Sequence, residues 1–203
     1  MKQLLIILGC VFSMAVPCLG QDAFPIHLGG FALGEDVSIH GDRVNMTSCR
    51  PMRYMEYLGE GEIQNVPGFK SGLIAFGTCD RPNKILRIKL KYQDRSKAFY
   101  KELMDRFEKR FGAPSEYLGD PFQIRIAWKW TFEDVKGGRI SLILQHNTKD
   151  TDEKIGNAVK LSLTSQIDRE RDCFKADHPK TKSLGQTGET LRSREMWKRY
   201  VPY

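Results

Sequence analysis

The feature that most constrains the fold is a change of hydrophobic period in the middle of the chain. Over residues 97–111 large apolar side chains recur every four positions, whereas the segments before and after alternate with a period of two. A four-residue repeat places its members on one face of an amphipathic helix, and that face has to contact a core. The members of the repeat are Phe99, Leu103, Phe107 and Phe111.

Both ends of this helix are marked in the sequence. Asp94 or Ser96 offers an N-cap side chain. Gly112 can take the positive φ that ends many helices, and Pro114 cannot continue one. The sequence therefore predicts a helix over residues 97–111.

The alternating segments predict β-strands on both sides of the helix. A turn of polar residues at 80–83 connects the first two of the clearest strands into a hairpin. An extended opening segment at 24–33 and a strand at 52–63 are weaker expectations, since glycines and tyrosines disfavour a helix there. The clearest strands are predicted at 69–78, 85–92, 124–132, 140–146 and 159–167.

The order of strands, helix and strands is typical of an α+β domain. We expect a mainly antiparallel sheet with one long amphipathic helix packed on one face. Residues 21–174 are predicted to form this single domain. From residue 175 the chain becomes polar and basic, and 175–203 is predicted to be a flexible tail.

The first twenty residues have the pattern of a secretory signal peptide cleaved after Gly20. Lys2 is followed by an apolar run over residues 4–16, and Pro17 and small residues come next. The run of thirteen residues is shorter than the roughly 20 that cross a bilayer, which disfavours a permanent anchor. Lipidation at Cys10 is the other alternative. The chain is thus predicted to be exported, to the periplasm or beyond the cell.

Three cysteines remain after the predicted cleavage, namely Cys49, Cys79 and Cys173. An oxidising compartment favours one disulfide and leaves one thiol over. We favour a bond between Cys79 and Cys173, with Cys49 free in a polar loop. Connectivity does not follow from sequence alone, so the other pairings remain open.

The net charge of +7 is concentrated in the tail, where seven basic and three acidic residues follow position 174. The predicted domain is only slightly basic. The charge is therefore poor evidence for nucleic-acid binding, and no nucleic-acid partner is expected.

Motifs of enzymes are scarce in this chain. HExxH, GxSxG and CxxC patterns do not occur, and no cofactor or metal is expected. His146 is the one histidine considered as an acid or base, although a hydrogen-bonded side chain at the edge of the core is the simpler interpretation. A small periplasmic hydrolase that uses His146 with Asp120 or Asp150 is the alternative function.

Two further clusters have a functional and a structural interpretation. Asp150, Asp152 and Glu153 could offer oxygen ligands to calcium, but a solvated acidic loop is favoured because the glycine and distal glutamate of a calcium loop are missing. Trp128 and Trp130 could stack on a sugar. Both alternate in step with apolar residues, however, which favours a place in the core.

The most distinctive pattern is a set of six cations on the outward positions of the predicted strands. No acid occupies these positions, and same-face neighbours lie close enough to repel. An anionic partner would explain the grouping, and a solvated face that resists aggregation is the structural alternative. The six residues are Arg87, Lys89, Lys91, Arg125, Lys129 and Lys160.

The end of the tail, residues 192–203, mixes cations with aromatic residues. This composition could give peripheral contact with an anionic membrane, or it could simply be disordered.

Three segments together resemble small exported bacterial α+β proteins of uncharacterised function: FEKRFGAP, IAWKWTF and SLILQHN. The likeness spans residues 69–174 and implies fold and export, but no catalytic residue. The leading hypothesis is an exported, non-enzymatic binding or scaffolding module of the cell envelope. Its expected partner is an anionic envelope component or another protein, and a structural subunit of an envelope complex is a third possibility.

Overall fold

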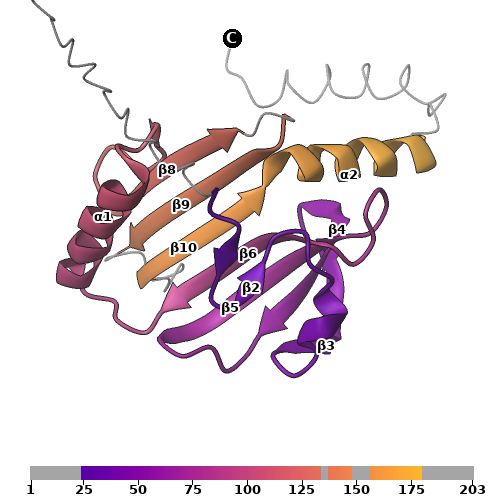
Figure 1. The fold of residues 1–203 in the computed structure, drawn as a ribbon, viewed down its shortest axis with the longest axis horizontal. Helices are drawn as coiled ribbons and strands as arrows, with labels where there is room; N and C mark the ends of the chain where they lie inside the picture. Colours follow the sequence, from indigo (N-terminus) through magenta and orange to yellow (C-terminus); the bar gives the residue numbers. More distant parts are fainter. Residues whose placement is uncertain (1–23, 134–136, 148–155, 180–203) are drawn as a thin grey trace, which may run out of the picture.

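The computed structural model describes residues 24–133, 137–147 and 156–179 (Figure 1). The predicted signal peptide, residues 180–203 of the predicted tail, and the acidic positions Asp150, Asp152 and Glu153 lie outside these ranges. The described elements are β1 (His27–Leu28), β2 (Phe31–Ala32), the 3-10 turn η1 (Val37–His40), β3 (Val44–Met52), β4 (Met55–Ile63), β5 (Phe69–Gly77), β6 (Ile85–Tyr92), α1 (Lys97–Phe111), β7 (Glu116–Tyr117), β8 (Arg125–Glu133), β9 (Arg139–Asn147), β10 (Gly156–Leu163) and α2 (Thr164–Asp177).

Eight strands form one sheet in the order β3-β4-β5-β6-β10-β9-β8-β7, and every neighbouring pair is antiparallel. Two meanders, β3 to β6 and β7 to β10, meet where β10 pairs with β6, and α1 connects them (Figure 1). The tiny hairpin of β1 and β2 is separate. The expectation of an α+β fold with a mainly antiparallel sheet is confirmed.

Helix α1 has the predicted bounds, and both predicted cap residues contribute to its start. The Ser96 hydroxyl accepts a hydrogen bond from the Phe99 amide, and the Asp94 carboxylate accepts one from the Ser96 amide. Gly112 ends the helix at φ 77°, which glycine adopts without strain. Because these signals are local, the sequence was sufficient to place the helix.

The aromatic stripe of α1 contacts strand residues of the second meander. Phe107 lies 5.7 Å from Trp130, and Phe111 lies 5.6 Å from Phe132, both measured between ring centroids. The indole N–H of Trp130 donates to the Gly112 carbonyl, so the end of the helix is tied to the centre of β8.

The N-terminal segment lies across the sheet, as Figure 1 shows. Its backbone pairs with the first residue of β6, because the Gly34 amide donates a hydrogen bond to the Ile85 carbonyl and the Ile85 amide donates one to the Glu35 carbonyl. Phe31 and Val37 are fully buried within the main core cluster. The weakly predicted extended segment is therefore two short strands and turns that add to the core.

The structure corrects the end of the last strand. A strand was predicted over residues 159–167, but β10 ends at Leu163 and α2 begins at Thr164. The buried positions here recur every three to four residues, which fits a helix and not the two-residue period of a strand. The helix instead turns Gln166, Ile167 and Glu170 inward. The described residues thus contain two long helices rather than one, and α2 continues past the predicted start of the tail.

Strand β3 was also not predicted, and it contains Cys49, which was expected in a loop. Its pairing with β4 is interrupted by register shifts next to Arg50 and Pro51. These irregularities removed the regular alternation that would have predicted a strand.

Helix α2 is held to the body by a buried carboxylate. Glu170 is fully buried, and its two oxygens accept hydrogen bonds from the backbone amides of the β5–β6 turn, at 2.6 to 3.2 Å. Four successive amides converging on one anion form a nest that offsets the cost of burying the charge. Gly77 leaves the space, because a Cβ there would lie 2.5 Å from Glu170 Oε1. The amides belong to Thr78, Cys79, Asp80 and Arg81.

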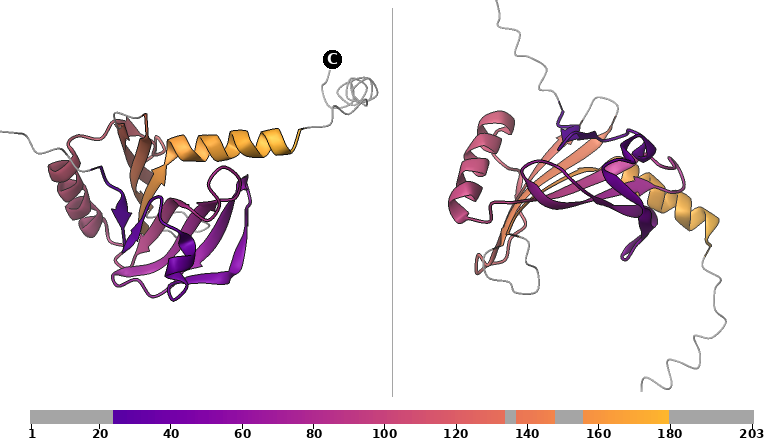
Figure 2. Two further views of the ribbon diagram at one scale, coloured as in Figure 1. Left: turned by 45° about the vertical axis from the view of Figure 1, so that its right-hand side comes forward. Right: turned by 90° about the horizontal axis from the view of Figure 1, so that it is seen from below.

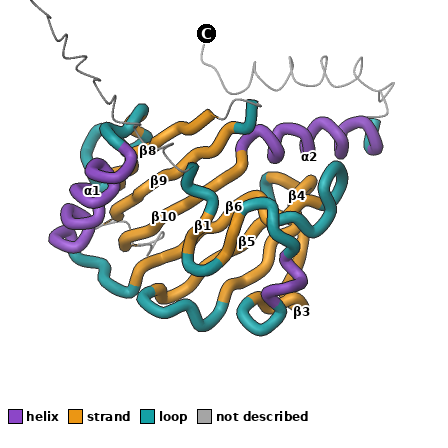
Figure 3. The backbone as a smooth tube through the Cα atoms, in the orientation of Figure 1, coloured by secondary structure: helices purple, strands orange, loops and turns teal. Residues whose placement is uncertain are grey.

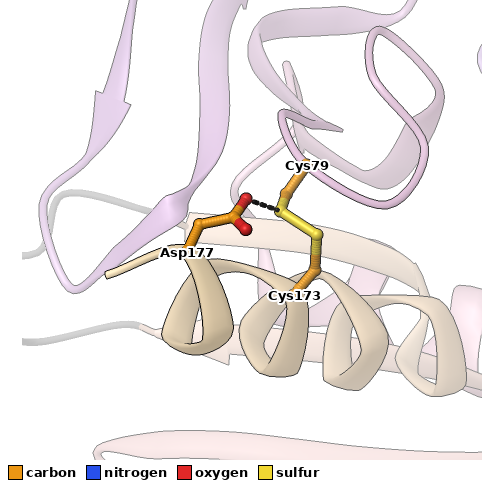
Figure 4. Close-up of side chains that lie close together, drawn as sticks. All are labelled: Cys79, Cys173 and Asp177. Atoms are coloured by element: carbon orange, nitrogen blue, oxygen red, sulfur yellow. Dashed lines mark hydrogen bonds between the residues drawn. A yellow bond between two sulfur atoms is a disulfide. The ribbon is translucent and has the colours of Figure 1, made fainter. Parts of the chain in front are cut away.

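A disulfide joins the same turn to the same face of α2. Cys79 and Cys173 are bonded across a sequence separation of 94 residues, and Asp177 Oδ2 lies 3.2 Å from Cys79 Sγ (Figure 4). The favoured pairing is confirmed, and Cys49 is the free thiol. Two turns before Cys173, Gln166 donates to the Asp80 carboxylate.

The two long helices lie at opposite ends of the sheet (Figure 3), and the sheet twists between them (Figure 2). Among the residues that the structure describes, neither helix has the length and apolarity that a membrane crossing needs.

The first prediction concerns Glu170. We expect Glu170→Gln to lower the free energy of unfolding by about 2 to 3 kcal/mol, because an amide has only one acceptor oxygen for four donors and its own N–H groups oppose them. Urea denaturation measures the change. Asp172→Asn, which removes an exposed carboxylate of the same helix, is the matched control and should cost less than about 0.5 kcal/mol.

The second prediction concerns the disulfide. Reduction, or Cys79→Ala with Cys173→Ala, should lower the free energy of unfolding by about 2 to 5 kcal/mol, because the bond closes a long loop in the unfolded chain. Cys49→Ala should leave the response to a reductant unchanged. Equal stability with and without a reductant would contradict this role.

Candidate functional site

The predicted cations meet on one face of the central strands. Lys89 of β6 and Lys160 of β10 are direct Cα partners across the middle of the sheet. In the same row, Ile143 of β9 separates Lys160 from Lys129 of β8. Partners in antiparallel strands point to the same side, and directly opposed side chains have Cβ atoms about 5 Å apart. The register therefore places Lys89 beside Lys160.

The other cations occupy the neighbouring rows of the same face. Arg87 pairs with Ser162 and Lys91 pairs with Ala158, each two positions from Lys89 along β6. Arg125 pairs with Asn147, two rows from Lys129. We call this set the cation face; it consists of Arg87, Lys89, Lys91, Arg125, Lys129 and Lys160.

Small residues form the floor between these long side chains. Ala127, Ser141, Ala158 and Ser162 share the cation face and are buried, whereas five of the six cations are half-buried and Arg125 is exposed. Long cationic side chains bury their aliphatic stems and keep the charged ends in water. A hollow of about 40 Å³ between Lys89 and Lys160 is too small for a ligand of any size, so contact would occur at the charged ends.

The electrostatics at Lys160 reflect this crowding. Burial, followed by repulsion from Arg87, Lys89, Arg125 and Lys129, lowers the pKa of Lys160 to about 8. The Lys160 ammonium therefore gains its proton against the field of its neighbours, and an anion on the face would relieve that repulsion.

The structure adds acids at both sides of the cation face, which corrects the expectation that it carries none. Glu116 of β7 is the Cα partner of Lys129, and its carboxylate forms an ion pair with the Lys129 ammonium at 2.9 Å. On the far side, β5 lies between β4 and β6, and its residues place Glu60 in the row of Arg87 and Glu62 in the row of Lys89. The cations thus form a central stripe between acidic edges. The sequence did not predict these edges, because neither β7 nor the pairing of β4 was predicted.

Arg87 is further engaged on its own side of the stripe. Its guanidinium donates to the Ser162 hydroxyl at 3.2 Å and lies 3.4 Å from Met55 Sδ. Burial lowers the pKa of Arg87, and Tyr57 and Glu60 act in the opposite direction. Arg87 therefore anchors the stripe near β4 and is a poorer contact for a partner than the lysines.

The alternative active site at His146 is not open. His146 is 1% exposed, its Nδ1 lies 2.6 Å from the Asn157 amide oxygen, and its ring stacks on Tyr100 at 5.0 Å. Asp120 accepts three backbone amides of its own loop and is not bonded to His146, and Asp150 lies outside the described residues. The structure does not bring the proposed acid–base set together.

A second histidine has a clearer acid partner that sequence reasoning missed. Arg43 donates to Nδ1 of His40, so the ring proton is on Nε2, which lies 3.0 Å from the Glu35 carboxylate. The hydrogen bond from His40 lowers the pKa of Glu35. His40 is buried and both its nitrogens are engaged, which indicates a structural cluster under the N-terminal segment.

One group of side chains has the spacing of a metal site. Ligand atoms of Cys79, Cys173 and Asp177 lie within 4.8 Å of one another. The two sulfurs are bonded together, however, and have no thiolate to offer a metal. The oxidised protein therefore has a covalent link here rather than a metal site.

No protein-family model, curated protein or solved structure matches this chain. Its function has to be argued from its own residues.

The third prediction concerns the repulsion at Lys160. The folded pKa of about 8 lies below the ordinary value of 10.5, so the unfolded chain binds more protons between these values and stability should rise with pH there. At pH 7 we expect Lys160→Met to raise the free energy of unfolding by about 1 to 3 kcal/mol. The gain should shrink from pH 8 to 10.5, as measured by urea denaturation.

The control is Lys109→Met, which removes an exposed cation from α1. It should leave stability within about 0.5 kcal/mol at every pH. A gain at Lys160 that is constant from pH 7 to 10.5 would show that packing, rather than charge, causes it.

Proposed function

We propose that this protein is an exported, non-enzymatic binding module of the bacterial envelope that contacts an anionic surface or polymer through the cation face. The observation that carries the proposal is the row in which Lys89 and Lys160 are direct cross-strand partners, with Lys129 two strands further along. Like charges in direct opposition weaken a sheet. An anionic partner accounts for their position.

The expected strength follows from the number of cations on the face. Lys129 is already neutralised by Glu116, and Arg87 is held against Ser162. The cation face also contains Lys89, Lys91, Arg125 and Lys160, and each contributes about 1 kcal/mol near an anionic surface. A total of about 4 to 5 kcal/mol corresponds to a Kd of a few tenths of a millimolar to 1 mM. Such binding is useful where anionic groups are dense, as on a polymer or a lipid surface.

The contacts that α1 makes with β8 support this orientation. The residues that contact α1 alternate along β8 with Lys129, as Trp130 does. The cations consequently lie on the opposite side of β8 from its α1 contacts, between the acidic edges. A hydrolase at His146 lacks this support, since its imidazole is closed off from solvent.

The fourth prediction tests this proposal by charge reversal. Lys89→Glu should weaken co-sedimentation with vesicles of anionic phospholipid, and binding to soluble polyphosphate, by about thirtyfold, because an attraction of about 1 kcal/mol is replaced by a repulsion of similar size. Lys109→Glu makes the same charge change on α1 and should have little effect. Comparing vesicles with polyphosphate distinguishes a lipid surface from a free polymer.

Two controls sharpen the test. Glu116→Gln should strengthen binding, because it frees the Lys129 ammonium for the partner. Half-molar salt should abolish binding, since the Debye length then falls to about 4 to 5 Å. Binding that survives half-molar salt, or that Lys89→Glu and Lys109→Glu weaken equally, would rule out the cation face.

Binding should also take up protons. An anion next to Lys160 raises its pKa from about 8, so calorimetric titrations at pH 8 in buffers of different ionisation enthalpy should report net proton uptake. The uptake should be lost in Lys160→Met.

A further inference from the structure

A second feature lies on the other side of β8 from the cations. A cavity of about 540 Å³ opens between α1, β7 and the start of β8, and this volume is within the usual range for small-molecule sites. It is lined by Tyr100, Tyr117, Asp120, Pro121, Gln123, Ile126 and Trp128. We call it the aromatic cavity.

Three aromatic side chains from three elements form its walls. Trp128 and Tyr117 are cross-strand partners with ring centroids 4.8 Å apart, and Tyr100 comes from α1. The two tryptophans that the sequence placed together in the core therefore have different roles. Trp130 is 2% exposed and hydrogen-bonded, whereas Trp128 is half-buried and lines the cavity.

A buried hydroxyl in the wall has no partner. Tyr100 is 6% exposed, and its hydroxyl has no hydrogen bond among the described residues. Buried tyrosine hydroxyls usually find a partner, and leaving one without is unfavourable. Burial, with smaller effects of Tyr117 and Glu108, raises the pKa of Tyr100, so the phenol stays protonated and can donate as well as accept.

The loop at the mouth is held in place. The Asp120 carboxylate accepts hydrogen bonds from the amides of Phe122, Ile124 and Arg125, and the Tyr117 hydroxyl donates to the Asp120 carbonyl. This pinned loop presents Phe122 at 84% exposure. Ile124 in the same loop is also 40% exposed, so the loop carries an exposed apolar surface beside the cavity.

The charges of the lining define the ligand further. Asp120 is the one ionisable acid or base among the lining residues apart from the phenols, and its carboxylate is occupied by the loop amides. The cavity therefore offers aromatic faces, a phenol hydroxyl and the Gln123 amide, but no free charge. A ligand that fits has flat apolar faces, hydrogen-bonding groups at its edge and no net charge in the part that enters.

We propose that the aromatic cavity binds an uncharged sugar ring of a glycan. The C–H faces of a pyranose pack on Trp128 and Tyr117, and a ring hydroxyl becomes the partner of the Tyr100 hydroxyl once a small movement of the wall uncovers that buried atom. An acyl chain would leave that hydroxyl unpaired, and an anionic ligand would find no cation. This site is independent of the cation face, which lies on the opposite side of β8.

The test uses the whole exported chain and two soluble probes, N-acetylchitotriose and cellotriose. Titration followed by tryptophan fluorescence and saturation-transfer NMR should show saturable binding in the millimolar range or tighter. Tyr100→Phe should weaken it about tenfold, because a single hydrogen bond is lost. The same variant should keep or raise the melting temperature, since it removes a buried, unpaired hydroxyl.

Two further variants keep the result interpretable. Tyr117→Ala should also weaken binding, and this side chain is exposed enough to be replaced without unfolding the protein. Tyr92→Phe makes the matched change on β6, outside the aromatic cavity, and should leave sugar affinity unchanged.

Three results would overturn the proposal. The first is that neither sugar shows saturable binding up to about 10 mM. The second is that Tyr100→Phe and Tyr117→Ala leave sugar binding unchanged. The third is that an apolar dye binds at these residues and the sugars do not, which would identify an apolar site instead.

Discussion

The fold depends on one buried anion. Glu170 collects four amides of the β5–β6 turn, and the neighbouring disulfide and the hydrogen bond from Gln166 to Asp80 reinforce the same contact between α2 and a distant part of the sequence. A lone buried carboxylate is costly, so the turn and the helix can only form this arrangement together. The two meanders of the sheet are joined at β6 and β10, and the same contact fixes the ends of both strands. The carboxylate therefore couples the halves of the molecule as much as it anchors a helix.

The cation face and the aromatic cavity use opposite sides of β8, and period two explains how one strand serves both. Lys129 points to one side, and Trp128 and Trp130 point to the other. Two unlike chemistries can thus occupy one strand without interfering, since the sheet separates them. In an envelope protein, a weak electrostatic contact and a specific sugar contact would act together on a polymer that carries both charge and sugar, because linked contacts multiply in strength.

Local signals decided what could be predicted from sequence. The bounds of α1 followed from its caps and its four-residue repeat, and the cation positions followed from alternation along β6, β8 and β10. Helix α2 was missed because its buried residues Gln166 and Glu170 are polar, and their partners lie about ninety residues away. The acidic edges were missed for a similar reason, since β7 has two residues and gives no periodic signal. The aromatic cavity could not be predicted because its walls come from three elements that meet only in the fold.

The two outer strands of the sheet have a consequence for behaviour at high concentration. Strand β7 has two residues, and β3 contains Pro51 and breaks its register with β4. An open sheet can recruit another chain along a long row of unpaired backbone groups, and short or bulged borders with proline do not offer such a row. A weak binding module of the kind proposed above would act best when many copies crowd together. These borders let the copies crowd without joining their sheets into aggregates.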